Sequence, residues 1–463
     1  MIRYGECSLK HTYKITITMR LLIFFLLGSI SFHASSWSNH TLVGKALFSS
    51  IPALNDVKPV PVEGLTEFLL ANEQELEVFL NDQESWMQKN LWHYKPRPEA
   101  LMFKATGNTS DIRHRFARAL RVNPNMKWPL YLQLLPGERR DKPSIPPELI
   151  SVFSEYGYLN SVQLIQLKQG DKASPVDIVT TATDEPDHGL DIGLFTDSKT
   201  DYGLTYGFGK QPFGNPNLEY GTQAPFHMGF YHESPVVYAL GGFLKETYPE
   251  YRIQLFKQLS EFAFQQGHDY WGWRFMGWGM HYIGDLSNPY HVIPVPGNST
   301  LDTLWVGVLD ILGYPQKKKD AIQLASNRHT ALEDFQSLVM SRAYEERQFE
   351  HKTIKALSAP DLIRTYEDGH VPTLMTRPAY NKADKVHEVL SATMPERYVN
   401  DVNVEYSQVP DKDDLIARVR ETSGDKGLSD LTDTIAELLK DFSINGSSYI
   451  QSILLSKAEE SEQ

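Results

Sequence analysis

Apolar residues recur every three or four positions along much of this chain, a spacing typical of helices that bury one face. Within 61–91, for example, Leu65, Leu69, Leu76, Phe79 and Trp86 follow it. The pattern predicts helices over 39–50, 61–91, 233–290, 316–350 and 429–455. We expect the first of these to be capped by Asn39 and to end at Ile51-Pro52.

The pattern changes between about 92 and 222, where proline and glycine are frequent. Only short, interrupted helices are expected there, over 112–121 and 147–167, joined by long loops that could carry an active site. The stretch 355–428 is mixed and polar. Because there is no internal repeat and no low-complexity linker, the sequence predicts an all-α fold, a single mainly helical domain with long active-site loops.

The N-terminus has the features of a signal peptide. The apolar run 21–32 (LLIFFLLGSISF) is too short to span a bilayer, and small residues suited to signal peptidase follow it at 34–36. We therefore predict a signal peptide over 1–36, with translation starting at Met1 or Met19, and export to the periplasm or the medium. An uncleaved anchor is the alternative.

The chain has 463 residues, with 58 acidic and 45 basic side chains and a net charge of −13. This acidity disfavours stable nucleic-acid binding. Cleavage after Ser36 would remove four basic residues and one acidic residue, leaving a still more acidic chain. It would also remove Cys7, which is the only cysteine. Core packing or metal ions, and not disulfides, would then stabilise the exported protein.

The most informative local pattern is HYIGDLSNPYH, in which His281 and Asp285 are four residues apart and share one face of an expected helix. Pro289 would end that helix and turn His291 back towards the same point. Two imidazoles and a carboxylate are ligands that zinc prefers. A His and an Asp four residues apart on an exposed helix face usually contact only solvent and bind no metal. Here the preceding aromatic, glycine-rich run WGWRFMGWGM indicates burial, and buried polar groups need partners.

Two further patterns could add ligands. His329 and Glu333 are again four residues apart, an ordinary exposed pair if alone but a second donor set beside the first motif. After cleavage, Trp37 would carry a free α-amine that loses its proton readily to a metal. Its amine and carbonyl could chelate together with His40, so the site would be complete only after export. Otherwise these residues simply begin a helix.

Acidic residues and histidines between these motifs leave alternatives open. The loop ATDEPDHGLD contains Asp184, Glu185, Asp187 and Asp191, which are either solvated acids or groups for metal or base chemistry. In PFHMGFYHE, His227 and His232 lie among aromatic residues. We expect one of these two to be an ordinary core histidine.

In this order, the motifs resemble the bacterial zinc-dependent phospholipase C family, whose superfamily includes fungal-type single-strand nucleases. The likeness rests on a Trp at the mature terminus with a nearby His, a loop Asp, an intermediate His, His-x3-Asp-x5-His and His-x3-Glu. SSWSNHTL and ATDEPD are similar to the larger exported branch that hydrolyses phosphatidylcholine. The likeness covers motifs from 37 to 333. Trp37 and His40 are closer together than in the compact enzymes, and the gap between His291 and His329 is longer.

The resemblance implies three zinc ions. We expect them in a catalytic domain over 37–350, with 351–463 as a helical extension of that domain or a separate small one. The first ion would be bound by Asp184, His227, His281 and Asp285. The second would be bound by His291, His329 and Glu333. The third would be bound by Trp37 and His40, with Asp285 as a bridge. Asp184 would also be the general base, with Asp187 as its rival and His232 as the rival of His227.

This interpretation predicts an exported phospholipase C that acts on phosphatidylcholine-like lipids at a membrane or micelle surface and releases diacylglycerol. Four aromatic residues could meet acyl chains, although most would pack in the core: Trp271, Trp273, Phe213 and Tyr231. The close alternative is a nuclease or nucleotidase of the same superfamily. More distant ones are a His-Asp phosphohydrolase, suggested by His268-Asp269, and a non-enzymatic protein with structural zinc.

Overall fold

The computed structural model describes residues 39–461 apart from 155, 215–218, 298–313, 315, 359–362, 368 and 411. The expected signal peptide and Trp37 lie outside the described residues. The structure is 61% helix and 3% strand, which confirms the all-α expectation.

The N-terminal half alternates short helices with long connections. Its helices are α2 (His40–Ser50), α3 (Pro52–Asn55), α4 (Leu65–Ala71), α5 (Glu73–Asn90), η1 (Glu99–Leu101), α6 (Ile112–Ala119), η2 (Pro147–Leu149), η3 (Gly157–Asn160), α7 (Pro175–Ala182), η4 (Glu185–His188), η5 (Tyr220–Gln223) and α8 (Ala224–His227). Two antiparallel strand pairs lie among them, formed by β1 (Val60–Pro61) with β4 (Lys172–Ala173) and by β2 (Tyr131–Leu134) with β3 (Gln163–Gln166). In the second pair, Leu132 lies opposite Ile165.

Longer helices dominate the C-terminal half. They are α9 (Pro235–Leu240), η6 (Gly242–Lys245), α10 (Pro249–Gln265), α11 (Asp269–Asp285), α12 (Pro289–Val292), α14 (Gln316–Glu345), α15 (Lys352–Ala356), the π-helix η7 (Val371–Met375), α16 (Arg377–Thr393), α17 (Glu396–Val399), η8 (Tyr406–Gln408), η9 (Lys412–Asp414) and α18 (Leu415–Ser461).

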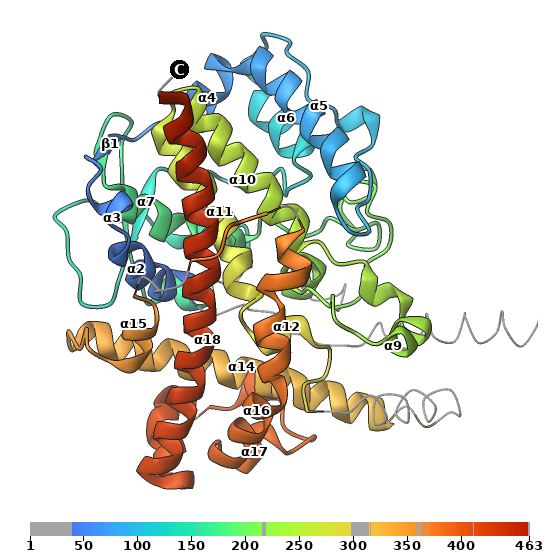
Figure 1. The fold of residues 1–463 in the computed structure, drawn as a ribbon, viewed down its shortest axis with the longest axis vertical. Coiled ribbons are helices and arrows are strands. Elements are labelled where there is room, and N and C mark those ends of the chain that lie inside the picture. Colours follow the sequence, from blue (N-terminus) through green and yellow to red (C-terminus); the bar gives the residue numbers. More distant parts are fainter. Residues whose placement is uncertain are drawn as a thin grey trace, which may run out of the picture.

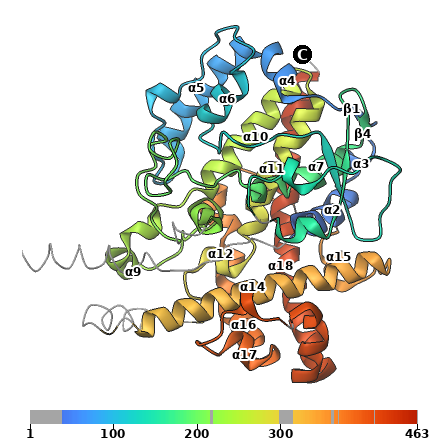
Figure 2. The ribbon, with the colours of Figure 1, turned by 180° about the vertical axis from the view of Figure 1, so that it is seen from behind.

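The helical hairpin of α10 and α11 forms the centre of the molecule (Figure 1). Every residue of α11 from Tyr270 to Asp285 is buried, because its aromatic residues and glycines pack against other helices and its polar residues Arg274, His281 and Asp285 have buried partners. On one side α11 packs against α7, where a Cβ atom at Gly277 would lie 2.5 Å from Ala182 Cβ. On another side it packs against α18, and Figure 2 shows α14 below α11 and crossing α18 part-way along its length.

The C-terminal segment shares the core of the rest of the chain. One continuous cluster of buried apolar side chains runs from Leu42 in α2 to Ile453 in α18. Residues after 350 therefore help to enclose the same interior. None of the helices in the described ranges has an apolar stretch long enough to cross a bilayer.

Several expected elements differ from the observed ones. The helix expected over 61–91 is two helices that break at Asn72, whose side chain donates to the carbonyl of Phe68. The interrupted helix expected over 147–167 is two 3₁₀ turns and a strand, because β3 pairs with β2. The stretch 233–290 contains breaks at 241, 246–248 and 266–268. Helix α7 was not anticipated. The last helix begins earlier than 429, with a kink at Gly424 (φ 70°).

Candidate metal centre

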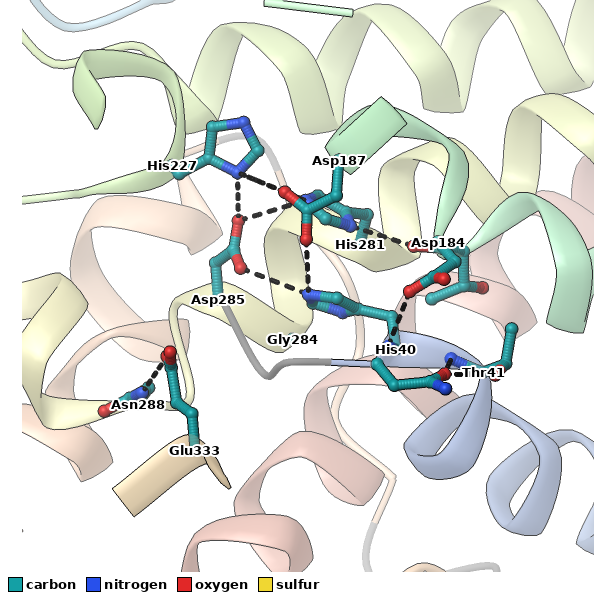
Figure 3. Close-up of polar contacts among 12 residues, drawn as sticks. His40, Thr41, Asp184, Asp187, His227, His281, Gly284, Asp285, Asn288 and Glu333 are labelled. Atoms are coloured by element: carbon teal, nitrogen blue, oxygen red, sulfur yellow. Dashed lines mark hydrogen bonds and ion pairs between the residues drawn. The ribbon is translucent and has the colours of Figure 1, made fainter. Parts of the chain in front are cut away.

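Six elements bring eight chemistry-bearing side chains together, of which Figure 3 labels all but His291 and His329. They come from the start of α2, from η4, from the end of α8, from the end of α11, from α12, and from the middle of α14. The side chains are His40, Asp187, His227, His281, Asp285, His291, His329 and Glu333. They form three groups of three, within each of which the potential ligand atoms lie within 4.8 Å of one another. Among the eight, Asp187 is the most exposed, at 10% of its side chain.

The first group joins His227, His281 and Asp285. Nδ1 of His227 lies 2.9 Å from Oδ2 of Asp285 and 3.1 Å from Nε2 of His281. Nε2 of His281 also lies 3.5 Å from Oδ2 of Asp285, as expected from their i, i+4 spacing on α11. Two ring nitrogens and one carboxylate oxygen thus converge on one point.

The second group joins His40, Asp187 and His281. Nε2 of His40 lies 3.5 Å from Oδ1 of Asp285 and 4.0 Å from Oδ2 of Asp187, so the two carboxylates lie between the rings of His40 and His227 (Figure 3). The His40 ring can reach this position because residue 284 is glycine. A Cβ atom there would lie 2.9 Å from Nδ1 of His40.

The third group joins His291, His329 and Glu333. Nε2 of His329 lies 2.9 Å from Nε2 of His291 and 2.7 Å from Oε1 of Glu333. Asn288 also donates to Oε1, at 2.9 Å, while Oε2 of Glu333 has no hydrogen-bond partner among the described residues. A buried carboxylate oxygen without a donor beside two facing imidazole nitrogens is the arrangement that a cation would satisfy.

Backbone carbonyls fix the tautomers of two histidines. Nδ1 of His281 donates to the carbonyl of Thr183 at 2.9 Å, and Nδ1 of His291 donates to the carbonyl of His227 at 2.7 Å. A neutral imidazole has one donor and one acceptor nitrogen, so in both rings the Nε2 lone pair faces a ligand group. Such outer hydrogen bonds are typical of histidines that bind metal ions.

The electrostatics of the centre reflect crowded carboxylates in a buried site. Burial raises the pKa of Glu333 to about 8 and lowers the pKa of His329 to about 3. Burial also raises the pKa of Asp187 to about 7, although His227 and His40 partly offset it. Burial opposes a charge on His227, but Asp285, Asp191 and Asp187 outweigh it and raise its pKa to about 10. Nearby carboxylates hold protons that a bound cation would replace.

The four acids of the 184–191 loop have four different environments. Asp187 is the one that joins a ligand group. Glu185 pairs with Arg274, and Asp191 pairs with Arg252. Asp184, the residue expected as ligand and base, accepts hydrogen bonds from the His40 backbone N–H (2.7 Å), from Gln133 (2.9 Å) and from the Tyr158 hydroxyl. The structure therefore places Asp187 in the centre, and Asp184 beside it as a support for His40.

The other candidate residues lie in ordinary structural contacts. His232 donates to or accepts from the hydroxyl of Thr376 at 2.7 Å and is in none of the ligand groups, so His227 is the histidine of its segment that joins the centre. His268 pairs with Glu63. Of the four aromatic residues considered for acyl-chain contact, Trp271, Trp273 and Phe213 are core residues and Tyr231 is half-buried.

A cavity of about 840 Å³ lies near the centre, although none of the eight ligand residues lines it. Asn39 and Tyr158 line it, and the Tyr158 hydroxyl donates to Asp184. The rest of the wall mixes apolar residues of 134–164 with charged and polar ones, among them Glu138, Arg139 and Glu345. The sequence offered no signal for Tyr158 or Gln133, because both come from loop and strand segments whose partners are distant in sequence.

The chain matches no known protein family, no curated protein sequence and no solved structure. The centre's chemistry must therefore be judged from its own residues. Imidazole and carboxylate ligands without thiolates fit zinc and other divalent transition metals.

Proposed function

We propose that this protein is an exported, zinc-dependent phosphodiesterase of the phospholipase C type. The observation that supports this most is the adjacency of three buried ligand groups, with His281 common to two of them. A single structural zinc would need only one closed set of four ligands. Adjoining three-ligand groups are better suited to several cations acting on one substrate.

Phosphodiester hydrolysis is the reaction that such a centre serves best. Bound zinc ions would neutralise phosphate oxygens and lower the pKa of a water molecule from about 15.7 to near 7. They would also explain how an acidic protein, with net charge −13, accepts an anionic substrate. One zinc ion would be bound by His227, His281 and Asp285. A second would be bound by His291, His329 and Glu333. His40 and Asp187 would supply the third, together with the proposed new N-terminus at Trp37.

Asp187 is our candidate for the general base. Its carboxylate is the most exposed of the group and lies within 4.0 Å of both His40 and His227. Its pKa, raised by burial to about 7, is close to the value that suits proton transfer at neutral pH. The Asp184 carboxylate is fully buried and accepts three hydrogen bonds, so a substrate water would have to displace a donor to reach it.

A lipid substrate is favoured over a nucleic acid by the charge of the chain, because a net charge of −13 repels a polyanion. A single-strand nuclease of the same reaction class is the alternative, and it would need aromatic platforms on which bases stack.

Turnover on two substrates tests the proposal. Mature secreted protein would be incubated with phosphatidylcholine vesicles and, separately, with single-stranded DNA. Chelator-treated protein and His281→Ala would serve as controls. We expect diacylglycerol and phosphocholine from the untreated wild type alone. Nucleotide release with intact lipid would identify the nuclease alternative, and no product from zinc-loaded protein would contradict an enzymatic role.

A further inference from the structure

Asp191 is a fully buried carboxylate that none of the three ligand groups uses. Its Oδ1 atom accepts hydrogen bonds from Nε of Arg252 at 2.9 Å and from Nη2 at 2.6 Å. Its Oδ2 atom accepts one from the hydroxyl of Tyr282 at 2.5 Å. Tyr282 follows His281 on α11, so this carboxylate lies directly behind the candidate metal centre.

Oδ2 of Asp191 also faces His227. Nε2 of His227 lies 3.5 Å from it, at ion-pair distance, and has no hydrogen-bond partner among the described residues. The other ring nitrogen, Nδ1, points into the centre towards Asp285 and His281. His227 therefore differs from His281 and His291, whose outer nitrogens meet backbone carbonyls.

We propose that Asp191 is a positioning residue that holds the ring of His227 when a cation binds to its Nδ1 atom. Without a cation, Nδ1 lies 2.9 Å from the Asp285 carboxylate and donates its proton to it. A cation at Nδ1 replaces that proton, so the remaining ring proton is on Nε2, where the Asp191 carboxylate faces it as an acceptor. A carboxylate behind a ligating histidine also increases the basicity of that ligand. The inference rests on the metal chemistry of the proposed function and is independent of its substrate.

Arg252 determines which oxygen of Asp191 is available to His227. The guanidinium is fully buried and also donates to the backbone carbonyls of Leu120 and Arg121 at 2.9 and 2.8 Å. Because Arg252 can only donate, it requires an oxygen at the Oδ1 position. In Asp191→Asn the amide oxygen would therefore face Arg252, and the NH₂ group would face His227. That NH₂ cannot accept from the Nε2–H that the cation-bound ring must carry, so ligation through Nδ1 is disfavoured.

A matched control lies on the same loop. Glu185 is also buried and accepts from Nε and Nη2 of a buried arginine, Arg274, at 2.9 and 2.7 Å. A third donor, the indole N–H of Trp278, lies 2.5 Å from it. Glu185 contacts no residue of the ligand groups through these bonds. Glu185→Gln thus disturbs a carboxylate–arginine pair of the same kind without changing the acceptor that faces a ligand histidine.

The test measures zinc binding and the Nε2–H of His227, not turnover. Zinc affinity and content would be obtained by chelator competition on the full mature chain, and histidine ¹⁵N NMR of the zinc-loaded protein would report the hydrogen bond of the His227 Nε2–H. We expect Asp191→Asn to weaken zinc binding at one site by about 10- to 100-fold and to shift that Nε2 resonance, with Glu185→Gln like the wild type. If Asp191→Asn is unfolded by circular dichroism, Tyr282→Phe is expected to weaken the same site by a smaller factor.

Three results would overturn the inference: wild-type zinc affinity in Asp191→Asn, an unchanged Nε2 resonance of His227 in that zinc-loaded variant, or an equal loss in Glu185→Gln. In the case of an unfolded Asp191→Asn, wild-type affinity in Tyr282→Phe would overturn it. A wild-type protein that binds zinc but hydrolyses neither lipid nor DNA would contradict the proposed function and leave this inference standing.

Discussion

The Nε2 atoms of His291 and His329 face each other at 2.9 Å in the buried interior. Since Nδ1 of His291 donates to the carbonyl of His227, its Nε2 carries a lone pair. His329 is neutral as well at neutral pH, because burial lowers its pKa to about 3. Glu333 lies 2.7 Å from His329 and has a pKa raised to about 8. Without a cation, this group must hold a proton; with one, the proton is released.

We predict that the metal-free protein becomes less stable as the pH rises from 6.5 to 8.5. The folded-state pKa values of Asp187, Glu333 and His227 are raised to about 7, 8 and 10. The folded chain therefore holds protons in this window that the unfolded chain has released, and that stabilisation is lost as the pH rises. The lowered pKa of His329 changes the pH dependence of stability only below pH 6.5. Thermal unfolding in chelator measures the effect.

Zinc should reverse this trend, because deprotonated ligands bind cations more tightly. The increase in Tm on adding zinc should therefore grow with pH. Glu333→Gln removes one of the titrating groups, so its metal-free slope should be shallower than that of the wild type. A metal-free Tm that rises over this range would show that the crowded carboxylates are not protonated as described.

Gly284→Ala should selectively remove the cation bound through His40. The added methyl group would lie 2.9 Å from Nδ1 of His40 and push that ring away from Asp187 and Asp285. The better helix propensity of alanine, about 1 kcal/mol, should offset much of the cost to folding. Metal analysis after dialysis should show loss of that ion with the other groups loaded. Gly242→Ala is the control, since nothing lies within 4 Å of its added Cβ atom.

Asp187→Asn and Asp184→Asn should separate the roles of the two loop aspartates. Loss of the general base should lower kcat about 10²- to 10⁴-fold in Asp187→Asn. Asp184→Asn keeps the base but leaves a buried donor without its acceptor, which should cost about 1–3 kcal/mol of folding free energy with a much smaller change in kcat. Steady-state kinetics and urea unfolding measure both. An equal loss of kcat in Asp184→Asn would restore Asp184 as the base.

The ion pairs of Asp177 should stabilise the position of α2 on α7. Asp177 lies 2.9 Å from Lys45 of α2 and 2.9 Å from Arg140. Burial would raise its pKa, but the two cations outweigh burial and lower it to about 2. The carboxylate thus stabilises the fold above pH 3.8, and this contribution disappears as the pH falls through 2. Asp177→Asn should lose about 2 kcal/mol in urea unfolding at pH 7 and much less at pH 2.

Local sequence signals predicted the elements whose ends depend on their own residues. Helix α2 begins after Asn39, whose side chain accepts from the N–H of Thr41, and ends at Ile51, as expected. The sequence predicted a helix over 316–350, and the corresponding helix α14 ends at Glu345. The strand at 163–166 was missed because its partner is some thirty residues away along the chain. Helical spacing alone could not identify that pairing.

By itself, the sequence determined that the protein is mainly helical and that His281 with Asp285, and His329 with Glu333, share helix faces, because neighbours on one helix are set by its period. Only the tertiary structure decided that His40, Asp187 and His227 join them. It also decided that Asp187 lies in the centre and that Asp191 faces Arg252. Those contacts connect residues up to about 250 positions apart, and they depend on how α2, α8 and the 184–191 loop pack around α11. No local period specifies such packing, so residues of one type in one short loop can have four different partners.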